Sequence, residues 1–154
     1  MPDVYAIDSC VYIPALRNAD ALAALKQFLR VGRSRVVIAG VVAMELRAGA
    51  PTPDHVNAVE ALLTPYALRN RAFGASHAAH KEAGRVLSAL VARERIVLAQ
   101  ASRSLTADVL LATSCRERDV VLITNNNRDF SAIQRHLRGF RFIPPWPTGP
   151  SVLR

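Results

Sequence analysis

The stretch "VVLITNNNRDF", residues 120–130, sets the most apolar run of the chain directly before a cluster of amides and charges. Residues 120–124 are rich in β-branched side chains, as is typical of a strand that is buried on both faces. Three asparagines, Arg128 and Asp129 follow at once. In open parallel sheets, ligands bind beyond the carboxyl ends of the strands. The stretch therefore predicts a central strand that ends at a functional edge.

Further apolar runs alternate with segments of helical periodicity along the chain. We expect strands at 3–7, 35–39, 67–69, 120–124 and 140–143, and helices at 11–30, 40–50, 52–66, 75–95, 104–119 and 128–139. Asn18 or Asp20 can cap a second helix within the first of these segments. Strands that alternate with helices predict a single α/β domain, a three-layer sandwich whose mostly parallel central sheet is flanked by helices. This domain is expected to span 1–143, followed by a proline-rich tail at 144–154.

The length of 154 residues suits one domain with a sizeable core. No apolar run reaches the roughly 18 residues that a membrane helix needs, and the opening "MPDVYAID" is unlike a secretory signal. We therefore expect a cytoplasmic protein with no membrane segment. Cys10 and Cys115 lack the spacing of a metal site, and both are expected to be small buried thiols that form no disulfide.

The chain is strongly basic, with 20 basic and 12 acidic residues and a formal net charge of +8. Eighteen of the basic residues are arginines, whose planar guanidinium groups bind phosphate through two hydrogen bonds. This balance favours an anionic polymer as partner. An arginine-rich composition that reflects a GC-rich genome would give the same charge, so the charge alone does not identify the partner.

Four acidic residues fall where they would share one edge of a parallel sheet. Asp8 follows the first strand, Asp129 follows the strand at 120–124, and Glu45 lies on the helix after the second strand. Asp108 lies in the first turn of the helix that leads into 120–124. Each of the last three also has an ordinary interpretation as a helix-end or surface charge. A carboxylate that ends a buried strand, as Asp8 does, needs a partner.

Together, these carboxylates predict a metal site. Two carboxylates 4 Å apart repel by about 4 kcal/mol at an effective dielectric constant near 20, and hard divalent ions such as Mg²⁺ or Mn²⁺ relieve that repulsion. His77 and His80 share a helix face but have no carboxylate at ligand spacing, so structural or solvent roles are expected for them. An acidic metal site in a basic protein suits hydrolysis of phosphodiesters.

Four motifs of the chain resemble motifs of the PIN-domain nucleases, and specifically of the VapC-type toxins of bacterial toxin–antitoxin pairs. They occur in the same order as in that family. They are "YAIDSCVYI" with Asp8, "SRVVIAGVVAMELRAG" with Glu45, "LTADVLLAT" with Asp108, and "VVLITNNNRDF" with Thr124, Asn126 and Asp129. The chain departs from the family's pattern at Cys10, where a polar or small residue is common. It also lacks the usual threonine shortly before the glutamate, and residues 50–100 contain no motif.

The resemblance implies a Mg²⁺-dependent endoribonuclease. Asp8, Glu45 and Asp108 would bind metal directly or through water, and Asp129 would complete the acidic quartet. Thr124 or Asn126 would orient the carboxylates from outside the metal's coordination shell. Ser9 would either do the same or cap the following turn, and the sequence does not choose between these two roles.

The resemblance also implies partners: transfer or ribosomal RNA as substrate class, a VapB-type antitoxin protein, and a second copy in a homodimer. Among the arginines, Arg128 is the first candidate for contact with RNA phosphate, and Arg17, Arg33 and Arg35 are weaker ones. The alternative function is a catalytically silent PIN-like module that binds RNA, against which the presence of all four acids counts. A phosphotransfer protein of the haloacid type would need an aspartate where Cys10 stands.

Overall fold

The computed structural model describes residues 2–32, 35–94 and 103–146. Strands and helices alternate along these residues, as the periodicity predicts. The strands are β1 (Val4–Ile7), β2 (Val36–Ala39), β3 (Ala72–Phe73), β4 (Val120–Ile123) and β5 (Phe142–Ile143). The helices are α1 (Ser9–Arg17), α2 (Ala19–Gly32), α3 (Gly40–Ala48), α4 (Pro53–Leu68), α5 (His77–Arg93), α6 (Arg103–Glu117) and α7 (Asn127–His136).

The strands form one five-stranded sheet in the order β3-β2-β1-β4-β5, and every neighbouring pair is parallel. The predicted α/β architecture is thus confirmed, with a sheet that is entirely rather than mostly parallel. β1 lies at the centre, and its register with β4 pairs Val4 with Val120 and Ile7 with Ile123. In a parallel sheet the carboxyl ends of all strands meet at one edge, here the edge where α1, α3 and α7 begin.

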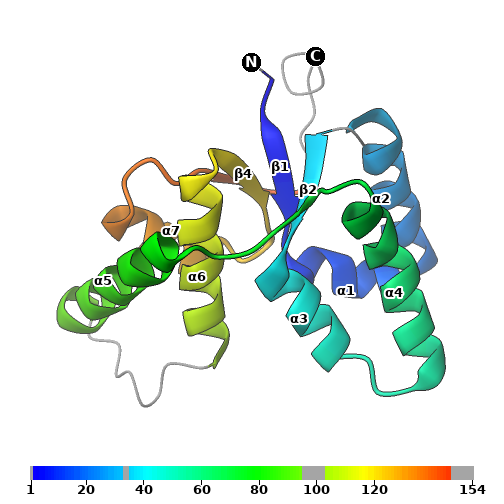
Figure 1. The fold of residues 1–154 in the computed structure, drawn as a ribbon, viewed down its shortest axis with the longest axis horizontal. Coiled ribbons are helices and arrows are strands. Elements are labelled where there is room, and N and C mark those ends of the chain that lie inside the picture. Colours follow the sequence, from blue (N-terminus) through cyan, green and yellow to red (C-terminus); the bar gives the residue numbers. More distant parts are fainter. Residues whose placement is uncertain (1, 33–34, 95–102, 147–154) are drawn as a thin grey trace.

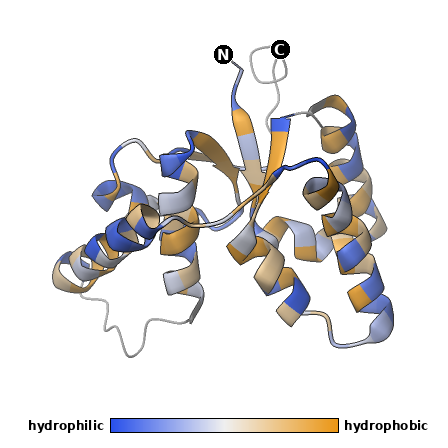
Figure 2. Cartoon of the chain, viewed as in Figure 1, coloured by the Kyte–Doolittle hydropathy of each residue, from blue (hydrophilic) through white to orange (hydrophobic). Residues whose placement is uncertain are grey.

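The helices form two groups beside the central strands. Figure 1 shows α1, α2, α3 and α4 on one side of the β1–β2 pair, and α5, α6 and α7 on the other. The core between them is aliphatic and aromatic, and β4 is buried along its whole length. Figure 2 shows hydrophobic colouring along β2 and β4 and a mixture of hydrophobic and hydrophilic segments on the helices. These buried strands explain why the sequence runs apolar without alternation.

Polar side chains fix where several helices begin. The side chain of Asn18 accepts hydrogen bonds from the backbone N–H groups of Asp20 and Ala21 at 2.8 and 3.1 Å, so α2 starts at the predicted break. Thr52 caps α4 and Ser76 caps α5 in the same way. Such caps satisfy backbone donors that have no partner inside the helix.

The prediction of a short strand at residues 67–69 is wrong. The helix α4 continues to Leu68, because its buried positions at Val59, Leu63 and Tyr66 keep the chain in helical register. Asn70 then adopts a left-handed backbone conformation with φ of 52°, which ends the helix and turns the chain. The edge strand β3 begins five residues later than predicted, at Ala72–Phe73.

The predicted proline-rich tail lies mostly outside the described residues. Its described start contacts the core, since the Trp146 ring stacks on Phe28 of α2 with centroids 4.9 Å apart. The division between a domain at 1–143 and a tail at 144–154 stays a prediction. Within the described ranges, none of the helices combines the length and the apolar character that crossing a bilayer requires.

A buried pair of hydroxyls joins α1 to α4 and offers a test of the packing. The Tyr12 and Tyr66 hydroxyl oxygens are 2.9 Å apart, and Tyr12 is fully buried. Tyr66→Phe is expected to lower the free energy of unfolding by about 1–3 kcal/mol, because the Tyr12 hydroxyl loses this partner. Adding Tyr12→Phe should recover most of that loss, as measured by urea unfolding. A double variant whose loss equals the sum of the two single losses would contradict the pairing.

Candidate metal and nuclease site

Asp8 lies at the junction between β1 and α1, at the carboxyl edge of the sheet. Its backbone N–H donates to the carbonyl of Ile123 at 3.0 Å, which extends the β1–β4 pairing by one residue. Its carboxylate is buried and has three donors. Thr124 Oγ1 and Cys10 Sγ donate to Oδ2 at 2.7 and 3.1 Å, and Ser9 Oγ donates to Oδ1 at 3.4 Å. The partner that this strand-ending carboxylate needs is therefore a set of hydroxyl and thiol groups.

Thr124 links Asp8 to the loop after β4. Its side chain is fully buried, and its Oγ1 accepts the backbone N–H of Asn126 at 3.0 Å while donating to Asp8. One hydroxyl thus fixes both the carboxylate at the end of β1 and the turn that starts α7. This geometry agrees with the orienting role that the resemblance implies for Thr124.

Asn126 joins the other two aspartates. Its side-chain Nδ2 donates to Asp108 Oδ2 at 3.2 Å and to Asp129 Oδ2 at 3.0 Å. Its Oδ1 accepts the backbone N–H of Asp129 at 3.4 Å, so Asn126 also caps α7. The amide lies between two carboxylates that are 21 residues apart in sequence, and it supplies neutral donors where two negative charges meet.

Glu45 reaches the same edge from α3 and is half-buried. Burial raises the pKa of the Glu45 carboxyl, the hydrogen bond with Ser9 lowers it, and the nearby charge of Asp8 raises it. Ser9 thus contacts two of the predicted acids. It is the first residue of α1 and not its cap, which favours the orienting role over the capping role that the sequence left open.

Asp108 shows the electrostatic cost of this arrangement most clearly. It lies in α6 with only 8% of its surface exposed. Burial, followed by the charges of Asp8, Asp129 and Glu45, raises the pKa of Asp108 to about 7. Every charge that shifts this pKa is another carboxylate, so the four predicted acids do interact with one another. A carboxyl whose pKa is raised by burial and by like charges is a candidate for a functional site.

The quartet is not a ready-made metal site. Among the residues that the structure describes, no group of three or more Asp, Glu, His or Cys side chains is arranged to hold a metal ion. The acids are instead held by hydroxyl, thiol and amide donors. The donor set itself is all carboxylate at its centre, which is the chemistry that Mg²⁺ and Mn²⁺ prefer.

The four predicted phosphate-contacting arginines have different positions. Arg128 is exposed in the first turn of α7, directly beside Asp129, and Arg17 lines a small cavity together with Glu45. Arg35 precedes β2, at the amino edge of the sheet, so it lies at the opposite end of the strands from the acids. Arg33 lies outside the described residues.

Cys10 is the site residue that sequence reasoning missed. The sequence predicted an ordinary small thiol, whereas Sγ donates to Asp8 and lies 3.4 Å from Thr124 Oγ1. Burial, followed by the charge of Asp8, raises the pKa of the Cys10 thiol to about 11, which keeps it protonated and able to donate. The available signal was position, because a residue two places after a strand-ending aspartate lies in the first turn of the next helix.

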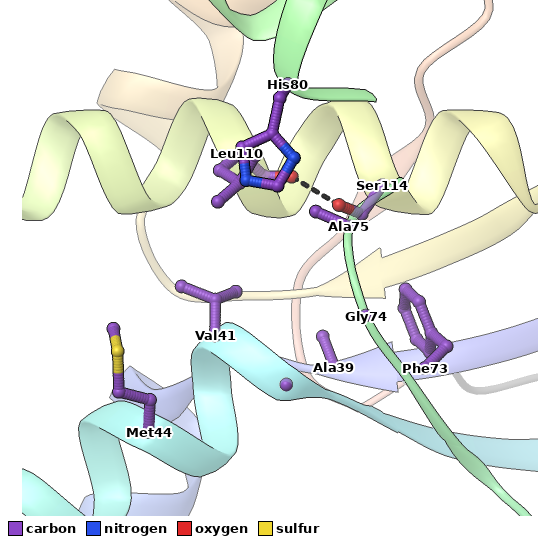
Figure 3. A pocket seen from close by; sticks show the side chains of 10 residues that line it. Ala39, Val41, Met44, Phe73, Gly74, Ala75, His80, Leu110 and Ser114 are labelled. Atoms are coloured by element: carbon purple, nitrogen blue, oxygen red, sulfur yellow. Dashed lines mark hydrogen bonds between the residues drawn. The ribbon is translucent and has the colours of Figure 1, made fainter. Parts of the chain in front are cut away.

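His77 and His80, for which the sequence predicts structural or solvent roles, both lie in α5, whereas His55 lines the small cavity that Glu45 also borders. The side-chain Nδ1 of His80 is 2.7 Å from the backbone oxygen of Ser76, within the first turn of α5. Figure 3 shows His80 pointing from α5 toward an open apolar cavity of about 260 Å³, with Met44 of α3 and Leu110 of α6 among its lining. This cavity lies between the two helices that carry Glu45 and Asp108.

Comparisons with known proteins place the fold. No protein-family model and no curated protein sequence match the chain. Solved structures do: a chain of the DNA-bound VapBC complex from Salmonella typhimurium is 21% identical with a TM-score of 0.68, covering 94% of this chain and 98% of that one.

Two further structures agree. A chain of FitAcB from Neisseria gonorrhoeae is 16% identical, with a TM-score of 0.67 and coverage of 94% and 100%. A chain of VapBC-1 from nontypeable Haemophilus influenzae is 18% identical, with a TM-score of 0.65 and coverage of 92% and 97%. At these identities the likeness shows the fold, and the chain has the PIN-like fold of these toxin–antitoxin structures over nearly its whole length.

The raised pKa of Asp108 predicts how stability depends on pH without divalent ions. Because the native pKa of about 7 exceeds the ordinary 3.8, the native state binds the extra proton between these values, and stability falls as pH rises through that window. Asp108→Asn should therefore leave stability unchanged near pH 4 and raise it by about 2 kcal/mol at pH 8. This stabilisation is roughly half of the free energy that the full pKa shift of Asp108 would correspond to, because the Asp108 carboxyl keeps some contact with solvent.

Thermal unfolding in EDTA from pH 4 to pH 8 measures this effect. Asp54→Asn is the matched control. It removes the same charge from an exposed position in the first turn of α4. An Asp108→Asn variant that is destabilised equally at both ends of the pH range would show that the carboxylate is not under electrostatic strain.

Proposed function

We propose that the protein is a Mg²⁺-dependent endoribonuclease toxin of the VapC type, which cleaves RNA phosphodiesters and is neutralised by a cognate antitoxin. The observation that supports this most is the convergence of Asp8, Glu45, Asp108 and Asp129 from four segments of the chain, at the carboxyl edge of a PIN-like sheet. The fold shared with VapBC and FitAB chains agrees with it.

The residues present fit a divalent cation. Asp108 is a buried carboxyl surrounded by like charges, and each charge that shifts its pKa raises it. Mg²⁺, or Mn²⁺ as the second choice, would supply the positive charge that balances them, held by Asp8, Glu45 and Asp108 with Asp129 at the rim. When bound, such an ion supplies Lewis-acid chemistry that makes water a nucleophile and stabilises the leaving oxygen.

The chain's own residues would orient the reacting groups. Thr124 and Cys10 both donate to Oδ2 of Asp8, whereas Oδ1 has only the longer 3.4 Å hydrogen bond from Ser9, so Oδ1 keeps more capacity to bind a ligand. Asn126 holds Asp108 and Asp129 at a fixed separation through one amide nitrogen. Outside this acidic centre, the exposed Arg128 beside Asp129 would contact a phosphate of the RNA strand.

A groove between α2 and α4 supports the antitoxin part of the proposal. It has a volume of about 370 Å³, and its lining combines Leu29, Leu62 and Pro65 with the basic side chains Lys26 and Arg30. An apolar groove with a basic border suits an amphipathic segment that also carries acidic residues. The neighbours named VapBC and FitAB are complexes of this toxin–antitoxin type.

The last part of the proposal is that the protein forms a homodimer, and this part rests on the family resemblance. The exposed apolar side chains of Met44, Val31 and Leu68 offer surface for such contacts, since they are 59%, 56% and 82% exposed. The size of the purified protein in solution tests it directly.

A catalytically silent RNA-binding module is the second candidate. It is favoured by the finding that no group of three metal-binding side chains is ready-made among the described residues. Such a module would keep the fold and the basic charge and would bind RNA without cutting it. The two functions are separated by one measurement of cleavage.

Cleavage of a fluorescent RNA by antitoxin-free protein is expected to require Mg²⁺ and to stop in EDTA. Asp8→Asn and Asp108→Asn should each lower the rate by roughly 100-fold or more, because each removes a charge that would hold the ion. Asp54→Asn, which lies on α4, should leave the rate within about twofold. Cleavage that persists in EDTA and in both site variants would sink the metal mechanism, and binding without any cleavage would favour the silent module.

Thr124 tests the orienting role separately from metal binding. Thr124→Val keeps the side-chain shape but removes the donor to Asp8 and the acceptor for Asn126, so we expect a loss of roughly 10–100-fold in kcat/KM. Thr124→Ser keeps the hydroxyl and should restore most of the activity. Equal activity of the two variants would show that the hydroxyl does not act through Asp8.

A further inference from the structure

Arginines precede most strands of the sheet. Arg35, Arg71 and Arg141 stand directly before β2, β3 and β5, and Arg118 stands two residues before β4. Because every strand runs in the same direction, these four side chains gather at the amino edge, the opposite end of the sheet from the acidic quartet. Figure 2 shows hydrophilic colouring where the chain enters β2 and between α4 and β3.

These arginines are not equivalent. Arg141 is balanced by two carboxylates, with its guanidinium nitrogens 2.8 Å from Asp3 and 3.0 Å from Asp119. Arg118 has no carboxylate partner among the described residues, and its guanidinium lies over the Phe73 ring at 5.6 Å from the centroid. Stacking on an aromatic ring orients a guanidinium while its N–H groups remain available to a ligand.

A cavity of about 190 Å³ opens beside Arg118. Arg71 borders it as well, and Val4, Val37 and Val120 from the starts of three strands contribute an apolar surface. Asn70, whose left-handed conformation turns the chain between α4 and β3, adds an amide to the same lining. The volume is below that of a typical pocket for a whole small molecule, but it accommodates a phosphate with part of its sugar.

This cavity and the acidic quartet lie on the same face of the sheet. Side chains alternate along a strand, so Val4, Ala6 and Asp8 point to one face of β1 and its extension. Thr124, which contacts Asp8, continues the face of Val120 on β4. The two sites lie at opposite ends of strands four residues long, about 13 Å apart along the strand. Ala6 and Leu122 between them are fully buried, so an RNA strand that reaches both sites has to pass over the outer surface and not along the sheet.

We propose that the cavity bordered by Arg71 and Arg118 is a non-catalytic site for a backbone phosphate of the RNA strand, remote from the acidic quartet. This proposal rests on the proposed function only in assuming that the bound strand is RNA. A guanidinium group recognises phosphate through charge-assisted hydrogen bonds, and Arg118 has no carboxylate partner among the described residues that would compete for it. The apolar surface from the strand ends suits the sugar next to that phosphate. A free phosphate offers the same chemistry, so the test separates the two sources.

Binding of a short fluorescent RNA by the full chain in EDTA, followed by anisotropy at several salt concentrations, measures this site without cleavage. Arg118→Ala is expected to weaken binding roughly three- to tenfold, and to reduce the slope of log affinity against log salt by about 1. Arg118→Glu should weaken binding further, because a carboxylate at the border of the cavity repels phosphate. Arg93→Ala removes an equal charge from the end of α5 and should change affinity by less than about twofold.

Three outcomes decide the proposal. Selective weakening by Arg118→Ala and Arg118→Glu supports it. Weakening by Arg93→Ala equal to that by Arg118→Ala overturns it, because only net charge would then matter. Stabilisation of the wild type but not of Arg118→Ala by inorganic phosphate, with RNA affinity unchanged, assigns the cavity to free phosphate and also overturns it. Absence of cleavage in Mg²⁺ with selective RNA binding intact would refute the nuclease and leave this site standing.

Discussion

The pairing of β1 with β4 is the constraint on which the candidate site depends. Parallel register sets Ile7 beside Ile123, so the next residues on the two chains, Asp8 and Thr124, meet at the carboxyl edge and form a 2.7 Å hydrogen bond. A slip of one residue would turn one of these side chains to the other face of the sheet. The apolar strands that make the core thus also decide which polar groups come together.

The site concentrates negative charge in a protein whose overall charge is strongly positive. Hydroxyl, thiol and amide donors from Thr124, Cys10 and Asn126 satisfy the carboxylate oxygens, yet they do not cancel the charge, as the raised pKa of Asp108 shows. A stable fold does not need such an arrangement. Local strain of this kind is typical of sites that are retained for chemistry.

One direction of the strands gives the molecule two chemically opposite edges. The carboxyl ends carry the acids and lie near helix N-termini, whereas the amino ends carry arginines and lie near helix C-termini, and each charge therefore suits the local helix dipole. That effect alone accounts for isolated charges at these ends. It does not account for Arg118, which stacks on Phe73 beside a cavity, nor for four acids that repel one another.

Local chemistry was enough to predict much from sequence: the alternating strands and helices, a helix cap at Asn18 or Asp20, and the expectation that Asp8, Glu45, Asp108 and Asp129 would share one edge. Hydrophobic period, cap residues and the parallel rule are all visible within a short window. Tertiary structure alone decided the length of α4 and the start of β3, the thiol of Cys10 as a donor to Asp8, and the position of Arg35 away from the acids. These features depend on strand register and on contacts between distant segments, whose energies no local window contains.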